Sequence, residues 1–128
     1  MSLTSERLLP PTERLFIPAE EIPAFEITQL EGKQLDEPRT VQLLMVTPDM
    51  HCVKVHRRQG SNDPAHVHAD HTTICCLVSG KLHLMIGTER FLAEPGDTWV
   101  YRQGVQHHSE ALEDSLVVEI KAPACKTW

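Results

Sequence analysis

The sequence predicts an all-β protein, built as an antiparallel sandwich or barrel. Short segments rich in β-branched and other apolar residues recur along the chain, and turn-forming glycine, proline and aspartate residues separate them. No stretch shows a sustained helical period with capping residues at its ends. Many short strands at regular spacing, without helices between them, are typical of two packed antiparallel sheets or of a closed barrel.

The candidate strands begin after an extended start. Four prolines in the first 24 residues rule out a long helix there and predict an N-terminal arm over residues 1–24. The barrel domain then occupies residues 25–128. Its predicted strands are Phe25–Gln29, Val41–Thr47, Cys52–Arg58, Thr73–Ser79, Lys81–Ile86, Arg90–Ala93, Thr98–Arg102, Gln106–Glu110 and Ser115–Lys121.

Composition narrows the function classes. The 128 residues are enough for one domain with a single core, and 41% hydrophobic with 23% charged residues is ordinary for a globular protein. A net charge of -6 and scattered basic residues argue against nucleic acid as a partner. No apolar run is long enough to span a membrane, no signal peptide pattern is present, and the four cysteines lack C-x-x-C spacing. We therefore expect a cytoplasmic protein with reduced thiols and no membrane partner.

The strongest local pattern is His66-Val67-His68. On a β-strand, residues i and i+2 point to the same face, so both imidazoles can be directed at one point. A third imidazole from a later strand, His107, would complete a face of three nitrogens around a transition metal and leave positions open for a ligand. This pattern predicts a binding or catalytic site.

Two glycine-framed motifs surround these histidines. The first, G-x5-H-x-H-x4-T-x6-G, comprises Gly60, His66, His68, Thr73 and Gly80, and the second comprises Gly96, Arg102, Gly104, His107 and Ala111. In this order and spacing the chain resembles the cupin superfamily of RmlC-like jelly rolls over roughly residues 40–123. The resemblance implies a cupin-type double-stranded β-helix, with His66, His68 and His107 as ligands of a divalent transition metal such as Fe, Ni, Zn or Mn.

The chain departs from the family pattern where cupins usually carry a carboxylate ligand. Thr73 occupies that position, and a neutral hydroxyl is a poor ligand for a divalent metal. The expected site is therefore three neutral imidazoles, which leaves the metal its full charge and favours anionic or enolising oxygen ligands. Asp70, His71 or Thr73 remain candidates to complete the metal shell.

Strand alternation extends the predicted site. The strand before His107 directs Trp99 and Tyr101 inward, and Tyr101 is a candidate to orient substrate or donate a proton. On the last strand, Glu119 is a carboxylate within an apolar run, which is costly unless it faces a polar cavity. Glu119 is therefore the candidate general base or acid. Arg102 either binds an anionic substrate or lies at the barrel rim.

Three functions remain open, each with a small-molecule ligand in the barrel. Three-histidine cupins include Fe(II) dioxygenases, and the missing carboxylate fits that comparison. The end of the chain also resembles small cupins that open unsaturated uronate rings, although only Glu119 matches their pattern, because Lys121 and Cys125 stand where that family has an aromatic and a basic residue. That comparison suggests Lewis-acid isomerase or lyase chemistry on a sugar acid or keto acid. The third function is a non-catalytic module that senses a small molecule or metal.

A homodimer is expected from the outward side of the strand at residues 73–79. Ile74, Cys76 and Val78 alternate with the inward residues and would leave an apolar face on the outside of the barrel. The N-terminal arm packs across its own domain or onto a second subunit.

Overall fold

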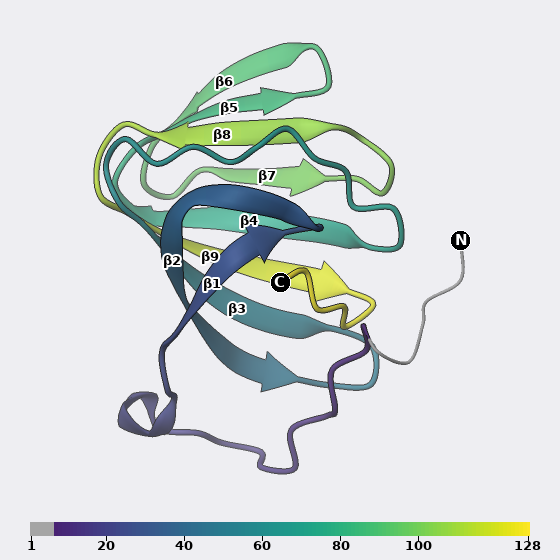
Figure 1. The fold of residues 1–128 in the computed structure, drawn as a ribbon. Helices are drawn as coiled ribbons and strands as arrows, with labels where there is room; N and C mark the ends of the chain where they lie inside the picture. The colour runs from purple at the N-terminus through teal and green to yellow at the C-terminus, as the bar shows by residue number, and fades with distance from the viewer. Residues whose placement is uncertain (1–6) are drawn as a thin grey trace.

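The chain folds into two antiparallel sheets that face each other across one interior (Figure 1). The computed structural model describes residues 7–128, and within that range it contains no α-helix, only a short 3-10 turn at Ala19–Glu21. The strands are β1 Phe25–Leu30, β2 Lys33–Val46, β3 His51–Arg57, β4 Thr72–Ser79, β5 Leu82–Ile86, β6 Glu89–Ala93, β7 Thr98–Tyr101, β8 His107–Ala111 and β9 Ser115–Ala122. One sheet has the order β1-β2-β3-β9-β4-β7 and the other β6-β5-β8. The all-β prediction is confirmed.

The strand bounds match the predictions closely, except for β2. The sequence predicts its start at Val41, whereas the strand begins at Lys33 and includes Pro38. This first half pairs only with β1, because the pairing with β3 starts at Thr40. Proline lacks a backbone N–H, and it is tolerated here because this half of the strand has no neighbour on one side. Its polar residues and its proline are untypical of a strand, which is why the sequence does not predict it.

The interior of the larger sheet is organised in rows across its strands. Because partners in register share a face, each row lines the same level of the barrel. The first two rows carry most of the polar side chains and the third is apolar: His51, Lys121, Thr73 and Tyr101; then Val53, Glu119, Cys75 and Trp99; then Val55, Val117 and Leu77. Beyond the apolar row, Arg57 is paired in register with Ser115 and both are buried, so polar interior side chains lie on both sides of the apolar row.

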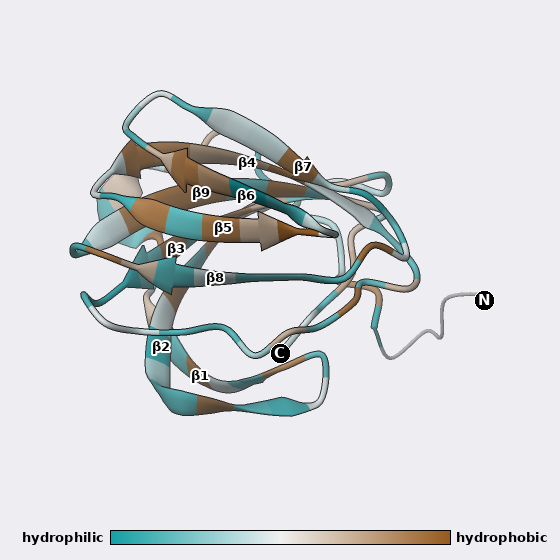
Figure 2. Cartoon of the chain, turned by 90° about the horizontal axis from the view of Figure 1, so that it is seen from above, coloured by the Kyte–Doolittle hydropathy of each residue, from teal (hydrophilic) through white to brown (hydrophobic). Residues whose placement is uncertain are grey.

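The outward side of the same sheet is apolar over β4, as predicted from strand alternation, and over the adjacent β9. Ile74 is 53% exposed and Val78 49% exposed on β4, and Ile120 is 40% exposed on β9. The largely hydrophobic β4 can be followed in Figure 2. The homodimer stays a prediction that this face motivates.

Within the described residues, no helix is long and apolar enough to cross a membrane.

The described part of the N-terminal arm, residues 7–24, packs against its own barrel. The Leu9 amide donates to the Ala124 carbonyl at 3.0 Å, and the Lys126 amide donates to the Arg7 carbonyl at 2.7 Å. Further along, the Thr12 amide donates to the Val46 carbonyl at 2.9 Å. The arm is thereby tied to the end of the barrel where the chain also terminates, as Figure 1 shows.

Gly80, the glycine that ends the first motif, has a position that only glycine fills. Its φ is +92°, and an added Cβ would collide with Ser115 Oγ and the Asp114 carbonyl and lie 2.6 Å from Ser115 Cα. We expect Gly80→Ala to lower the free energy of unfolding by more than about 2 kcal/mol, because backbone strain and overlap add.

Gly96→Ala is the matched control for that measurement by urea denaturation. Gly96 has a φ of +94° but nothing within 4 Å of the added Cβ, so it reports conformational strain alone, about 1 kcal/mol. Equal losses in the two variants would show that the overlap at Gly80 is relieved without cost.

Candidate metal centre

A pair of backbone hydrogen bonds joins the two histidine-bearing segments. The His66 amide donates to the His107 carbonyl and the His107 amide to the His66 carbonyl, both at 3.0 Å. Beside them, the Gly104 amide donates to the His68 carbonyl at 2.9 Å. His66-Val67-His68 lies in the extended connection between β3 and β4, outside the strands as the predicted strand bounds place it, and His66 forms an isolated bridge with His107. The alternation still holds, because both histidines are buried and Val67 is exposed.

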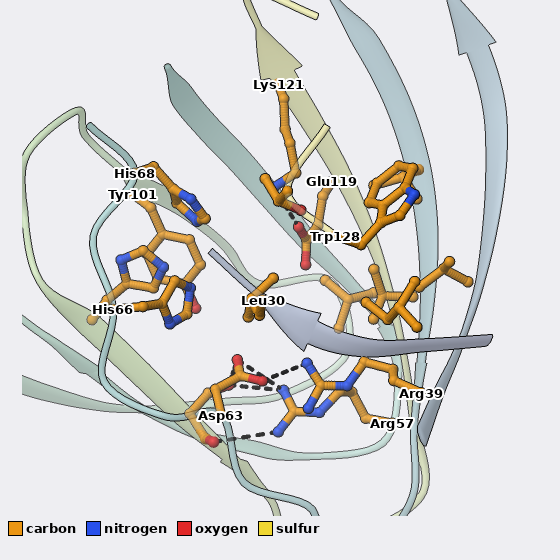
Figure 3. Close-up of a pocket in the computed structure, with 18 of the residues that line it drawn as sticks. Leu30, Arg39, Arg57, Asp63, His66, His68, Tyr101, Glu119, Lys121 and Trp128 are labelled. Atoms are coloured by element: carbon orange, nitrogen blue, oxygen red, sulfur yellow. Dashed lines mark hydrogen bonds and ion pairs between the residues drawn. The ribbon is translucent and has the colours of Figure 1, made fainter. Parts of the chain in front are cut away.

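The three predicted histidines converge. Their ring centroids are 4.2 Å apart for His66 and His107, 4.8 Å for His68 and His107, and 4.9 Å for His66 and His68. One ligand-capable nitrogen from each ring lies within 4.8 Å of the other two. Figure 3 shows His66 and His68 on the same side of the cavity. The predicted cluster His66, His68 and His107 is confirmed.

Each ring has its Nδ1 engaged by an oxygen acceptor. His66 Nδ1 donates to the Pro64 carbonyl at 2.7 Å, His107 Nδ1 to the Val105 carbonyl at 3.1 Å, and His68 Nδ1 to Glu31 Oε1 at 3.0 Å. Such contacts fix the proton on Nδ1 and leave Nε2 as the free nitrogen. His107 Nε2 is buried without a hydrogen-bond partner among the described residues. This arrangement fits a metal ion bound through Nε2 atoms.

Burial favours the uncharged form of His66 and His107. Desolvation, followed by the proximity of His66 and His68, lowers the pKa of His107 to about 3, and desolvation likewise lowers the pKa of His66. Neutral imidazole is the form that binds a metal, so at neutral pH no proton has to be displaced from these two rings. The cluster is compatible with a divalent ion.

The hydrogen bond from His68 leads to an ion pair that the sequence analysis missed. Glu31, in the β1–β2 turn with a φ of +50°, accepts from His68 and from Arg7, whose Nη2 lies 2.8 Å from Glu31 Oε1. Burial alone would raise the pKa of Glu31, but the hydrogen bonds from His68 and Arg7 lower it to about 2. Glu31 is therefore a carboxylate that orients the His68 ring. Sequence spacing gave no sign of this, because 37 residues separate the two partners.

Asp70 and His71, considered as extra ligands, lie on the far side of His68. His71 Nδ1 donates to Asp70 Oδ1 at 2.8 Å, and the His71 ring centroid is 4.5 Å from that of His68. Asp70 also lies 3.2 Å from Arg7 Nε. Asp70, His71 and Cys125 form one group of potential ligand atoms, and His71 forms another with Glu31 and His68, whereas neither Asp70 nor His71 is grouped with His66 and His107.

Thr73 is fully buried, and its hydroxyl accepts a hydrogen bond from the ammonium group of Lys121. Lys121 Nζ donates to Thr73 Oγ1 at 3.2 Å and to Glu119 Oε1 at 2.9 Å. The position where the family pattern has an acidic ligand therefore faces an ammonium group. Burial would raise the pKa of Glu119, but the charge and hydrogen bond of Lys121 hold it below its usual value.

Tyr101 lies in the cavity wall as predicted, stacked on the cluster. Its ring is parallel to that of His107, with centroids 3.6 Å apart and an angle of 10° between planes. Burial raises the pKa of the Tyr101 hydroxyl well above its usual range, so it is protonated at neutral pH. Trp99 also lines the cavity. Arg102 is exposed and lines a groove outside the barrel, so it lies at the rim.

A second buried ion cluster forms another wall of the cavity. Asp63 is paired with Arg39, lies 3.5 Å from Arg57 Nη1, and accepts from Ser109 Oγ at 2.9 Å. Burial would raise the pKa of Asp63, but Arg57 and Arg39 lower it to about 2. Arg57 also bonds Ser61 and Ser109, which ties β3 to the segment before the histidines. In Figure 3 this group lies below His66, and Glu119 and Lys121 lie across the cavity from the histidines.

The cavity is small. Its free space for the centres of water-sized molecules is about 40 Å³, lined by the three histidines, Tyr101, Glu119 and Lys121 among others. A single buried water needs roughly 10–15 Å³ on this measure, so the space suits an ion with a few waters or a small ligand.

Solved structures with a similar fold are numerous, and several cover most of this chain. KdgF from Halomonas sp. is 30% identical over 66% of this chain and 78% of its own, with a TM-score of 0.64. An RmlC-like cupin from Shewanella frigidimarina NCIMB 400 is 18% identical over 88% of this chain and 93% of its own, with a TM-score of 0.74. A predicted oxalate decarboxylase from Thermotoga maritima is 15% identical over 84% and 98%, with a TM-score of 0.73. The last two support the fold alone.

Two facing antiparallel sheets with three histidines gathered in the interior define the class of protein to which this chain is compared. The family model described as "Cupin domain" matches residues 53–120, which include all three histidines. This chain therefore belongs to the cupin domain family. No curated protein matches the chain.

Adjacent histidines test the metal centre. We expect His107→Ala to abolish stoichiometric metal binding, measured by elemental analysis after dialysis against Zn(II), because it removes one of three nitrogen donors. His108→Ala is the control, since His108 is exposed on the other face of β8. Circular dichroism should show folded barrels in both. Full metal retention in His107→Ala would refute the assignment.

The Glu31 carboxylate can be tested separately from the ligands. Partners that orient a ligand typically contribute 10–100-fold to metal affinity, so we expect Glu31→Gln to weaken Zn(II) binding by roughly tenfold or more in equilibrium dialysis. Glu26→Gln on the exposed side of β1 is the control. If both variants bind as the unmodified protein does, the orientation of His68 does not depend on Glu31.

Proposed function

We propose that this chain is a metal-dependent enzyme that catalyses proton transfer on a small carbonyl compound, in the manner of an isomerase or lyase. One observation carries the proposal: a half-buried carboxylate, Glu119, is held by the buried Lys121 in the cavity across from the three-histidine cluster. A perturbed carboxylate in a cavity next to a candidate metal centre is a common arrangement for acid–base chemistry.

The histidines would hold the ion. Bound by His66, His68 and His107, a divalent metal would supply Lewis-acid polarisation of a ligand oxygen. Imidazole suits Fe, Ni and Zn, whereas Mn favours oxygen donors, so Mn is the weakest of the four candidates.

Glu119 would act as the base. Its lowered pKa keeps it ionised at neutral pH, so it can accept a proton from the carbon next to the substrate carbonyl. The electron pair of that C–H bond then becomes the C=C bond of an enolate, and the carbonyl π electrons move to oxygen. In a substrate whose deprotonated carbon bears a hydroxyl group, the hydroxyl proton moves to the enolate oxygen. Return of the first proton from Glu119 to the former carbonyl carbon then leaves the new C=O at the neighbouring carbon and completes an isomerisation. Tyr101, which stays protonated, would donate a hydrogen bond to a substrate oxygen.

A dioxygenase is the second candidate, favoured by the donor set. Thr73 leaves the site without the usual acidic ligand, as in the three-histidine cupins that use Fe(II) and O2. The two candidates differ in whether O2 is consumed.

Solvent deuterium exchange tests the leading proposal. We expect the Zn(II)- or Ni(II)-loaded protein to catalyse deuterium incorporation into pyruvate and 2-butanone, followed by NMR without O2. Glu119→Gln should reduce that rate by about 10²–10⁴, the usual contribution of a general base, with metal content unchanged. Glu110→Gln, an exposed acid on β8, is the control. An equal rate in Glu119→Gln would contradict the role of the base.

Oxygen uptake separates the candidates. An oxygen electrode reading with the Fe(II)-loaded protein and a panel of diketones, thiols and phenols should show no substrate-dependent uptake if the chemistry is proton transfer. Uptake would favour the dioxygenase. Stoichiometric metal binding with neither exchange nor uptake would leave a non-catalytic sensing module.

A further inference from the structure

Lys121 is a buried cation in the wall of the cavity, across from the three-histidine cluster. It is 3% exposed on β9, in register with Thr73, which is itself in register with Tyr101 on β7. The stacking of Tyr101 on His107 connects this row to the histidines. The ammonium group therefore belongs to the wall of the same cavity, rather than to the barrel surface.

The hydrogen bonds of Lys121 leave one donor free. An ammonium group has three N–H donors, and two of them go to Thr73 Oγ1 and Glu119 Oε1. Among the described residues no other acceptor bonds to Lys121. A charge with this little compensation is expensive to bury unless a ligand supplies the remaining partner.

The charged side chains that line the cavity carry a net positive charge, the same sign as Lys121. Three cations line it, Arg39, Arg57 and Lys121, against the two carboxylates Asp63 and Glu119, while burial favours the neutral form of His66 and His107. Asp63 is shared by the two arginines, so Glu119 alone faces Lys121. The charged group of Arg7, Glu31 and Asp70 lies behind His68 and does not line the cavity. A divalent ion would add to the positive excess inside.

We propose that Lys121 binds the carboxylate of the substrate, which makes the substrate a small oxo or hydroxy acid. The inference rests on the proposed function and deepens it by naming the substrate class and its anchor. A compact ammonium with rotatable donors suits a monodentate carboxylate contact in a narrow cavity. Glu119 remains beside the bound acid as its base, because both side chains come from the same face of β9.

Binding of acids and their neutral amides tests the anchor. We expect isothermal titration of the Zn(II)-loaded protein to show pyruvate and glycolate binding about tenfold or more tightly than pyruvamide and glycolamide. Lys121→Met, which keeps the apolar stem, should lose this preference without changing amide binding. Lys54→Met removes a cation from the outward side of β3 and is the matched control.

A second variant guards against misfolding. Lys121→Met leaves the carboxylate of Glu119 without its cationic partner, whereas Lys121→Met combined with Glu119→Gln removes both charges of the pair. The double variant should also lose the preference for acids while retaining metal by elemental analysis. Unchanged preference for acids over amides in either folded variant would overturn the proposal.

The outcomes separate the anchor from the reaction. If acids and amides bind the unmodified protein equally while deuterium exchange proceeds, the Lys121 proposal is wrong and the proton-transfer function stands. If acids bind through Lys121 but no exchange occurs at any metal, the anchor stands and the proposed reaction is wrong.

Discussion

The reciprocal backbone bond between His66 and His107 is the constraint on which the rest of the site depends. His66 and His107 are far apart in the sequence, but the two amide–carbonyl hydrogen bonds between them hold their backbones side by side. Their imidazole rings are therefore brought close together by the backbone alone. Hydrogen bonds are directional, so the two reciprocal contacts fix both the spacing and the relative orientation of the two backbones. The convergence of the three imidazoles is thus a product of the fold.

The electrostatics of the interior follow from this placement. A barrel this small has little room to separate its buried charges, so each carboxylate lies against a cation: Asp63 with Arg39 and Arg57, Glu119 with Lys121. Removing a single partner from such a pair costs more than the pair contributes, because the remaining charge stays buried. These ion pairs therefore contribute little to the stability of the barrel. Their presence in the cavity instead indicates that the cavity binds a ligand.

Much of the architecture and the core of the site could be predicted from the sequence, because both depend on residues that are only a few positions apart. Alternation placed Thr73, Tyr101 and Glu119 inward, and motif spacing selected His66, His68 and His107. What could not be predicted depends on distant pairing. Glu31 meets His68, and Arg39 and Arg57 meet Asp63, only after the strands have paired, and a lone charged residue in a sequence gives no sign of its partner.

The placement of Glu31 and Arg7 has a consequence for comparing relatives of this chain. The family match spans residues 53–120, and both residues lie before it. Two proteins with the same three histidines inside that span can thus orient one imidazole by different means. Transferring a reaction between cupins on the shared domain alone would overlook the leading segment, which supplies Glu31, the hydrogen-bond partner of His68.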